Sequence, residues 1–316
     1  MKKLLYSFLI LINSCSALSL NQTKGNDMKN LNADFNKLWN YSNPLETREK
    51  FLRVLDEKKE SESLDYILQL KTQIARTYSL RAEFEQAHTV LDEVEKKLNS
   101  DTLIAHVRYY LERGRTYNSD KKKNEAYNLF EAAYNLGKKS HLENYTVDAA
   151  HMLAIASAGL DEKILWSEKG IEAAKESDDP NTRRWIGIFY NNTGWDLFES
   201  KRFDDALIQF EKCSNFHQEN KNKVALAIAK WSIAKTYRLL GRIDKALDIQ
   251  ENQLEDANGI DKGGYIYEEL AELYLVKNNT DKAKDFFKKA YEVLSKDLWL
   301  VKNEADRINR LLKLSK

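Results

Sequence analysis

The feature that most constrains the fold is a set of small and aromatic residues that returns about every forty residues. In the clearest copy, Gly114 is followed after three residues by Tyr117, after twelve by Ala126 and after sixteen by Phe130. The small residues that anchor the five visible copies are Ala75, Gly114, Gly194, Ala234 and Ala271, spaced by 39, 80, 40 and 37 residues. Because the gap of 80 is two periods, it predicts a further copy near Ala154.

The most regular position of the frame is the alanine twelve residues after each anchor. It is occupied by Ala87, Ala126, Ala206, Ala246 and Ala283. Two antiparallel helices can approach closely only where their facing side chains are small, so we expect each alanine to face its anchor. The aromatic residue of the first helix would fill the space beside this pair, and the later Phe or Leu would pack onto the next copy. A single hairpin cannot bury its apolar face, so the copies must stack.

The frame resembles the tetratricopeptide repeat, whose first helix carries Leu-Gly and then Tyr and whose second carries Ala, an aromatic residue and Ala. The resemblance covers Leu68 to about Leu294, and the match is close between Asn191 and Leu207. The spacing near 40 exceeds the 34 residues of the standard unit, so we expect extra helical turns or longer connections. With only 2 Pro and 11 Gly in 316 residues, long helices are favoured.

The predicted fold is therefore all-α, a solenoid of about six hairpins that the resemblance implies to be a right-handed α-α superhelix. Residues 31–67 are predicted to form N-terminal capping helices, residues 68–294 the repeat array and residues 295–316 a C-terminal capping helix. The resemblance also implies that the first helices of the hairpins line a concave groove that binds peptides or partner helices. That function is an analogy with the fold.

The N-terminal residues 1–19 have the organisation of a secretory signal, in which Lys2 and Lys3 precede an apolar run of nine residues. The tetrapeptide ending at Cys15 resembles a bacterial lipobox and predicts a lipid anchor, whereas Ala17 and Ser19 fit an ordinary cleavage site and predict a secreted protein. Residues 20–30 would be a flexible tether. We expect a location in the cell envelope, or in the cytoplasm if the segment is not a signal.

Several kinds of chemistry have no support in the sequence. The net charge is +1, so no basic field favours nucleic acid as a partner. There is no phosphate-binding loop, zinc-helix motif, nucleophile elbow or dinucleotide fingerprint, and no cofactor or metal is expected. A hydrolase using His151 as base, with Asp148 one helical turn before it and Arg115 nearby, is the least favoured reading because no nucleophile completes the set. Cys213 lies in an apolar helical pattern and is expected to be a buried thiol.

The candidate binding residues are those that helical geometry directs toward the groove side of the first helices. They are Arg76, Arg108, Arg115, Asp148, His151, Asn191, Asn192, Trp195, Trp231, Lys235 and Arg238. This set predicts a surface that is basic over most of its length, with an acidic end at Glu268, Glu269 and Glu272. Arginine pairs with carboxylates, asparagine can hold a peptide backbone and tryptophan offers a flat apolar anchor, which suits an acidic or C-terminal peptide.

We therefore expect a non-catalytic scaffold that binds a protein or peptide partner and touches a membrane only through an N-terminal lipid. Its resemblance to carboxylate-clamp repeat proteins is partial, because the expected Lys and Asn positions are not all filled. The alternative is an intracellular regulator that senses a peptide.

Overall fold

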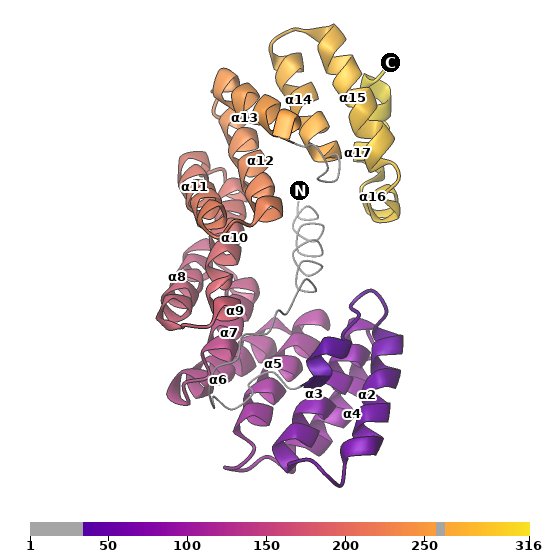
Figure 1. The fold of residues 1–316 in the computed structure, drawn as a ribbon, viewed down its shortest axis with the longest axis vertical. Coiled ribbons are helices and arrows are strands. Elements are labelled where there is room, and N and C mark those ends of the chain that lie inside the picture. The colour runs from indigo at the N-terminus through magenta and orange to yellow at the C-terminus, as the bar shows by residue number, and fades with distance from the viewer. Residues whose placement is uncertain (1–33, 257–262) are drawn as a thin grey trace. The chain divides into compact units, whose positions relative to one another are not determined.

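The computed structural model describes residues 34–256 and 263–316, and over these residues every regular element is a helix. The chain divides into two compact units, residues 1–185 and 186–316 (Figure 1). The predicted signal, the lipobox at Cys15 and the tether lie outside the described residues. The predicted fold class, an all-α array of stacked helical hairpins, is confirmed.

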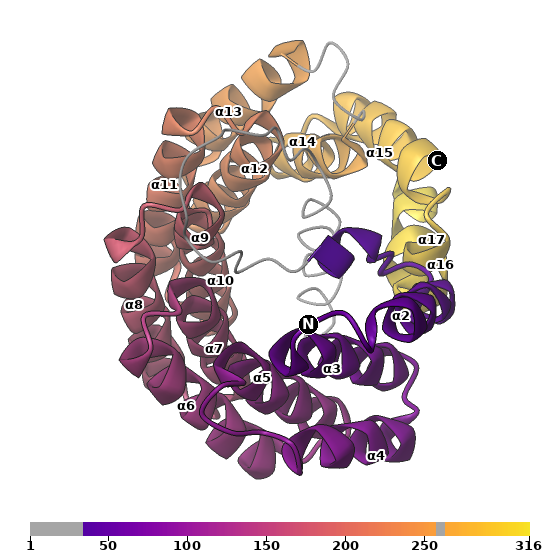
Figure 2. The ribbon, with the colours of Figure 1, turned by 60° about the horizontal axis from the view of Figure 1, so that its bottom comes forward.

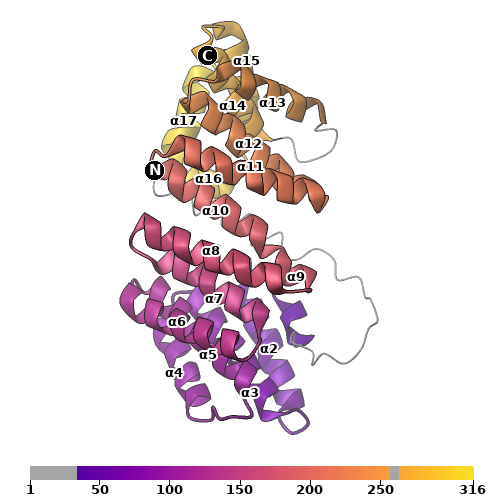
Figure 3. The same ribbon diagram turned by 90° about the vertical axis from the view of Figure 1, so that its left-hand side faces the viewer.

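In the first unit, the described residues form a short 3₁₀ helix, three hairpins and two further helices. Its elements are η2 (Asp34–Leu38), α2 (Pro44–Lys58), α3 (Leu64–Leu80), α4 (Phe84–Glu95), α5 (Leu103–Ser119), α6 (Lys123–Lys139), α7 (Glu143–Ala156), α8 (Leu160–Glu176) and α9 (Pro180–Arg183). Consecutive helices from α3 to α8 pack on one another (Figure 3). The first helices α3, α5 and α7 form one layer, and the second helices α4, α6 and α8 form another (Figure 2).

The second unit repeats this arrangement with three more hairpins and two further helices. Its elements are α10 (Trp185–Glu199), α11 (Phe203–Glu219), α12 (Lys223–Leu239), α13 (Ile243–Asp256), α14 (Gly264–Val276), α15 (Thr280–Leu294), α16 (Leu298–Asn303) and α17 (Ala305–Leu314). The helix α12 packs on both α13 and α14, and α17 packs on α15. We use the term first-helix face for the exposed side of the α3, α5 and α7 layer, and of the α10, α12 and α14 layer.

The long repeat period comes from the helices. Six of them contain 17 residues each, namely α3, α5, α6, α8, α11 and α12, whereas most of the connections between consecutive helices are short. The expected extra helical turns therefore account for the spacing near 40.

Five hairpins turn in the same way. The residue seven positions after the anchor has a positive φ in each, namely Ala82, Lys121, Lys201, Gly241 and Asn278. The next backbone N–H donates to the carbonyl five residues earlier, as from Lys122 to Tyr117 and from Arg202 to Leu197, both at 2.9 Å. This is the Schellman end of a helix. The copy near Ala154 turns through Ser157–Gly159 instead, which explains its departure from the frame.

The packing at the anchors differs from the prediction in one respect. A Cβ placed on Gly114 would lie 2.5 Å from Cε1 of Phe130, and one placed on Gly194 would lie 2.5 Å from Cε1 of Phe210. The ring sixteen residues later, and not the alanine twelve residues later, is thus the nearest neighbour of each glycine. This Phe therefore fills the contact within its own hairpin, which the repeat frame had not predicted; its packing onto the next copy stays a prediction. The alanines Ala126 and Ala206 are fully buried.

Candidate functional site

All eleven predicted binding residues lie on first helices, and none of them is exposed. Trp231 is 4% exposed, Asn191 5% and Arg108 8%, while Arg76, Arg115, Asp148, Asn192, Lys235 and Arg238 are half-buried. Long polar side chains on a helix surface normally reach water. These instead contact one another, so their partners decide what they can bind.

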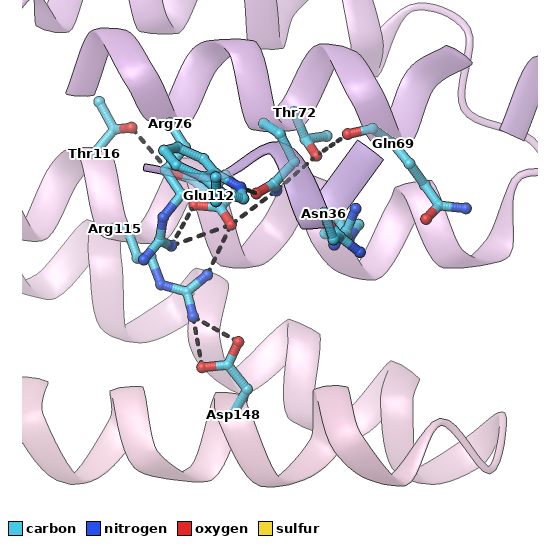
Figure 4. A network of polar contacts seen from close by, with 11 residues as sticks. Asn36, Gln69, Thr72, Arg76, Glu112, Arg115, Thr116 and Asp148 are labelled. Atoms are coloured by element: carbon cyan, nitrogen blue, oxygen red, sulfur yellow. Dashed lines mark hydrogen bonds and ion pairs between the residues drawn. The ribbon is translucent and has the colours of Figure 1, made fainter. Parts of the chain in front are cut away.

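A ladder of alternating charges crosses the first-helix face of the first unit (Figure 4). Arg76 on α3 donates to Oε2 of Glu112 on α5 at 3.0 Å, and Arg115 donates to Oε1 of the same carboxylate at 2.9 Å. Arg115 then reaches α7, where its Nη2 lies 2.5 and 2.6 Å from the two oxygens of Asp148. We call these four residues the charge ladder.

The two arginines and two carboxylates of the charge ladder compensate one another's charge. Burial alone would raise the pKa of Glu112, but Arg115 and Arg76 outweigh it and hold that pKa below its ordinary value. Burial likewise opposes the charge of Arg115, and Asp148 and Glu112 raise its pKa nevertheless. The expectation that Arg76 and Arg115 present free positive charge is therefore wrong. Its cause is that Glu112 lies on the first helix next to that of Arg76, and Asp148 on the first helix next to that of Arg115, each about one repeat away in sequence.

The Asp148 and His151 pair does not have the geometry of an acid–base dyad. Both oxygens of Asp148 accept from Arg115. His151 is 9% exposed and packs against Trp185, with ring centroids 5.1 Å apart. Burial lowers the pKa of His151 to about 4, which makes it a weak base at neutral pH. These contacts give His151 a packing role.

Arg108 has a different environment from the other arginines of the first unit. Its Nη2 donates to Oδ1 of Asn36 at 2.9 Å, and its guanidinium lies over the rings of Phe35 and Tyr145 at 5.5 and 5.6 Å. Asn36 belongs to η2 and lies 72 residues before Arg108. Sequence reasoning missed it, because no periodic signal connects a residue before the array with one inside it.

The N-terminal residues reach this face a second time through Trp39, whose Nε1 donates to Oε1 of Gln73 at 3.1 Å. The segment before α2 therefore covers part of the first-helix face of the first unit.

The second unit carries a row of aromatic side chains on its first-helix face. The ring centroids of Trp195 on α10 and Trp231 on α12 are 5.7 Å apart, and those of Trp231 and Tyr265 on α14 are 5.9 Å apart. The Nε1 of Trp231 also donates to the backbone carbonyl of Tyr265 at 3.1 Å. These rings tie three successive first helices together.

The asparagines at the start of this row contact each other. Nδ2 of Asn191 lies 3.3 Å from Oδ1 of Asn192, and Oδ1 of Asn191 is buried without a donor among the described residues.

Arg238 and Arg307 of the second unit pair with carboxylates, whereas Lys235 forms no such pair among the described residues. Arg238 donates to both oxygens of Glu269, at 2.5 and 3.1 Å, and Arg307 on α17 donates to Glu268 from Nε at 2.9 Å. Lys235 instead lies over the ring of Trp231, 5.0 Å from its centroid. Within residues 34–256 and 263–316, no carboxylate oxygen lies within ion-pair distance of Lys235. Burial lowers its pKa, although Glu269 and Glu268 counteract part of that effect.

Other chemistry is not assembled in the part of the chain that the structure describes. No group of His, Cys, Asp and Glu there could hold a metal ion, and no helix there combines the length and apolar character needed to cross a bilayer. Cys213 is 2% exposed, and burial raises the pKa of its thiol to about 12. The expectation of a buried thiol is confirmed.

Comparisons with known proteins agree with this architecture. Residues 265–293, within the α14/α15 hairpin, match the tetratricopeptide repeat family model. No curated protein matches the sequence. Among solved structures, the chain is similar to the apo form of RapI, with 15% identity, a TM-score of 0.68 and coverage of 89% of this chain and 84% of that one.

Two further structures show the same similarity. A STAND signal transduction ATPase with a tetratricopeptide repeat sensor, from Pyrococcus horikoshii, is 16% identical with a TM-score of 0.67, and the match covers 84% of this chain but 42% of that one. The C-terminal part of a tetratricopeptide repeat protein from Cytophaga hutchinsonii is 16% identical with a TM-score of 0.54, covering 85% and 95% of the two chains. Such identities establish the fold alone.

Proposed function

We propose that this chain, which has the fold of tetratricopeptide repeat proteins, is a non-catalytic scaffold that binds a peptide segment of a partner protein. The binding surface is the first-helix face of the second unit. The segment carries a carboxylate that pairs with Lys235 and an apolar side chain that packs beside Trp231.

The observation that carries this proposal is the position of Lys235 in the repeat. Lys235 follows its anchor by one residue, as Arg76 and Arg115 follow theirs. Arg76 meets Glu112, two residues before the next anchor, and the corresponding residue for Lys235 is Glu269. Glu269 is already held through both oxygens by Arg238. Among the described residues Lys235 is thus a half-buried ammonium without a direct counterion, which favours an incoming carboxylate.

We propose no reaction because both members of the candidate acid–base pair, Asp148 and His151, are held by other residues. Asp148 is engaged by Arg115 and His151 is packed against Trp185, so this pair does not orient a general base toward a substrate.

The test is an array of synthetic hexapeptides in which each Asp or Glu member has an Asn or Gln counterpart. The wild type is expected to prefer acidic members with an adjacent apolar residue. Loss of a hydrogen bond between charged groups corresponds to roughly ten- to hundredfold in affinity, so Lys235→Met is expected to weaken binding of these members by at least roughly tenfold. Lys235→Arg is expected to retain it, and Lys223→Met, an exposed lysine on the same helix, serves as the control. Equal binding by wild type and Lys235→Met, or no peptide binding at all, contradicts the proposal.

We further propose that the chain is exported and anchored through a lipid on Cys15. The support is the sequence alone, namely the basic residues, the apolar run and the lipobox-like tetrapeptide within residues 1–15.

An intracellular regulator that senses a peptide is the second candidate. It is favoured by the Pyrococcus horikoshii structure, whose name assigns a sensor role to its tetratricopeptide repeats. Both candidates require the same peptide surface, and the location of the chain in the cell distinguishes them.

A further inference from the structure

The first unit contains a buried cation that has no anion beside it among residues 34–185. Arg108 is 8% exposed, and its Nη1 is shielded from solvent and has no acceptor among the described residues. The other arginines of the α3 and α5 layer each meet a carboxylate: Arg76 meets Glu112, Arg113 meets Asp92 and Arg115 meets Asp148. No carboxylate of residues 34–256 or 263–316 forms an ion pair with Arg108. Removing a guanidinium from water without a counterion costs free energy. A structural role alone does not require an arginine to be buried in this way.

An unfilled acceptor lies on the neighbouring first helix at the same position of the repeat. Gln69 and Arg108 each precede their anchor by six residues, on helices α3 and α5, which pack together. Gln69 is 6% exposed, and its Nε2 donates to Asp65 at 2.6 Å. Its Oε1 is buried without a donor in the described part of the chain. In Figure 4 the amide of Gln69 points away from Glu112, so the charge ladder does not satisfy it.

Among the described residues, the acceptor that Arg108 meets is neutral and comes from outside the repeat array. Oδ1 of Asn36 lies 2.9 Å from Nη2 of Arg108, where a carboxylate would form the same bond and add charge neutralisation. Asn36 is half-buried, whereas Phe35 beside it is 1% exposed and packs with Phe51 in the core. Phe35 therefore anchors η2 in the core, and the side chain of Asn36, on the same helix, accepts from Nη2 of Arg108.

We propose that Arg108 is a second carboxylate-binding residue, with Asn36 as its displaceable neutral cover. An acidic side chain of the bound peptide takes the place of the Asn36 carboxamide and accepts from both terminal nitrogens of Arg108. A backbone N–H of the same peptide donates to Oε1 of Gln69. The ligand class is an extended peptide with an acidic residue. This inference rests on the proposed peptide-binding function and assigns to it a site in the first unit.

The first test needs no ligand. Asn36→Asp supplies the missing carboxylate within the chain, so the variant is expected to unfold at a higher temperature than the wild type at pH 7. Asn128→Asp adds the same charge at an exposed position of α6 and controls for net charge. If Asn36→Asp lowers the melting temperature relative to Asn128→Asp, Arg108 does not lack an anion and the inference is wrong.

The second test uses the hexapeptide array with Lys235→Met as the background, so that the carboxylate preference of the second unit is removed. A remaining preference for acidic over amide members is expected, and adding Asn36→Asp is expected to weaken it by roughly ten- to hundredfold. Adding Asn128→Asp leaves it unchanged. An acidic preference that survives Asn36→Asp overturns the inference while leaving the function intact. Failure of the wild type to bind any member defeats the proposed function instead.

Discussion

Replacing Glu112 by Gln removes the central charge of the ladder while keeping the shape of the side chain. Glu112 is 5% exposed and accepts from Gln73 at 3.2 Å, from Arg76 at 3.0 Å and from Arg115 at 2.9 Å. The substitution leaves the half-buried Arg76 without its carboxylate partner, and breaking a buried ion pair from one side costs about 3–5 kcal/mol. At about 2–4 °C per kcal/mol for a body of this size, the melting transition of the first unit falls by about 10 °C.

Differential scanning calorimetry measures this shift, and hydrogen exchange in α3, α5 and α7 assigns it to the first unit. Glu125→Gln, an exposed glutamate on α6, is the matched control and is expected to leave the transition unchanged. A shift for Glu112→Gln as small as that of Glu125→Gln would refute the reasoning, because it would mean that the ladder contributes no net stability.

The pH dependence of the stability difference between the wild type and Glu112→Gln follows from the lowered pKa of Glu112. A depressed folded-state pKa contributes stability that is present above the unfolded pKa, about 4.3, and is lost as the pH falls through the folded value. The difference between the wild type and Glu112→Gln is therefore largest at neutral pH and shrinks below about pH 4. A difference that grows on acidification contradicts this assignment.

Two further outcomes are expected. Gly194→Ala forces a Cβ against Phe210 and costs about 1–3 kcal/mol from overpacking, offset by about 1 kcal/mol of helix propensity. In denaturant titrations, Phe210→Leu should therefore lower the free energy of unfolding less in the Gly194→Ala background than in the wild type. Equal losses in the two backgrounds would show that the two groups do not touch. Labelling of cells with a fatty-acid analogue should mark the wild type and not Cys15→Ser, and label that persists in Cys15→Ser rejects the lipid anchor.

The repeat could be predicted from sequence because its signal is local. Only a small side chain fits where the two helices of a hairpin cross. An alanine therefore recurs twelve residues after each anchor, from Ala87 to Ala283. The contact of Phe130 with Gly114 was not predicted, since spacing shows that Phe130 is buried but not which helix it meets. The left-handed turn residues were not recognised either, because Ala82 and Lys121 carry no signal for a positive φ.

The chemistry of the first-helix face could be predicted only in part. Helical geometry placed the eleven side chains on the correct layer, but their pairing depends on neighbours 31 to 36 residues away. Whether Glu269 pairs with Arg238 or with Lys235 is decided by side-chain packing between α12 and α14. That choice leaves Lys235 without a carboxylate partner in the described residues, and no spacing rule reveals it.

Hydrogen exchange with a hexapeptide selected from the array tests the central claim most directly, since it reports which layer of helices the peptide contacts. The account predicts slower exchange in the first helix α12 around Trp231 and Lys235, with the second helices α11 and α13 unchanged. Protection confined to the second helices, or the same protection in Lys235→Met, would contradict it.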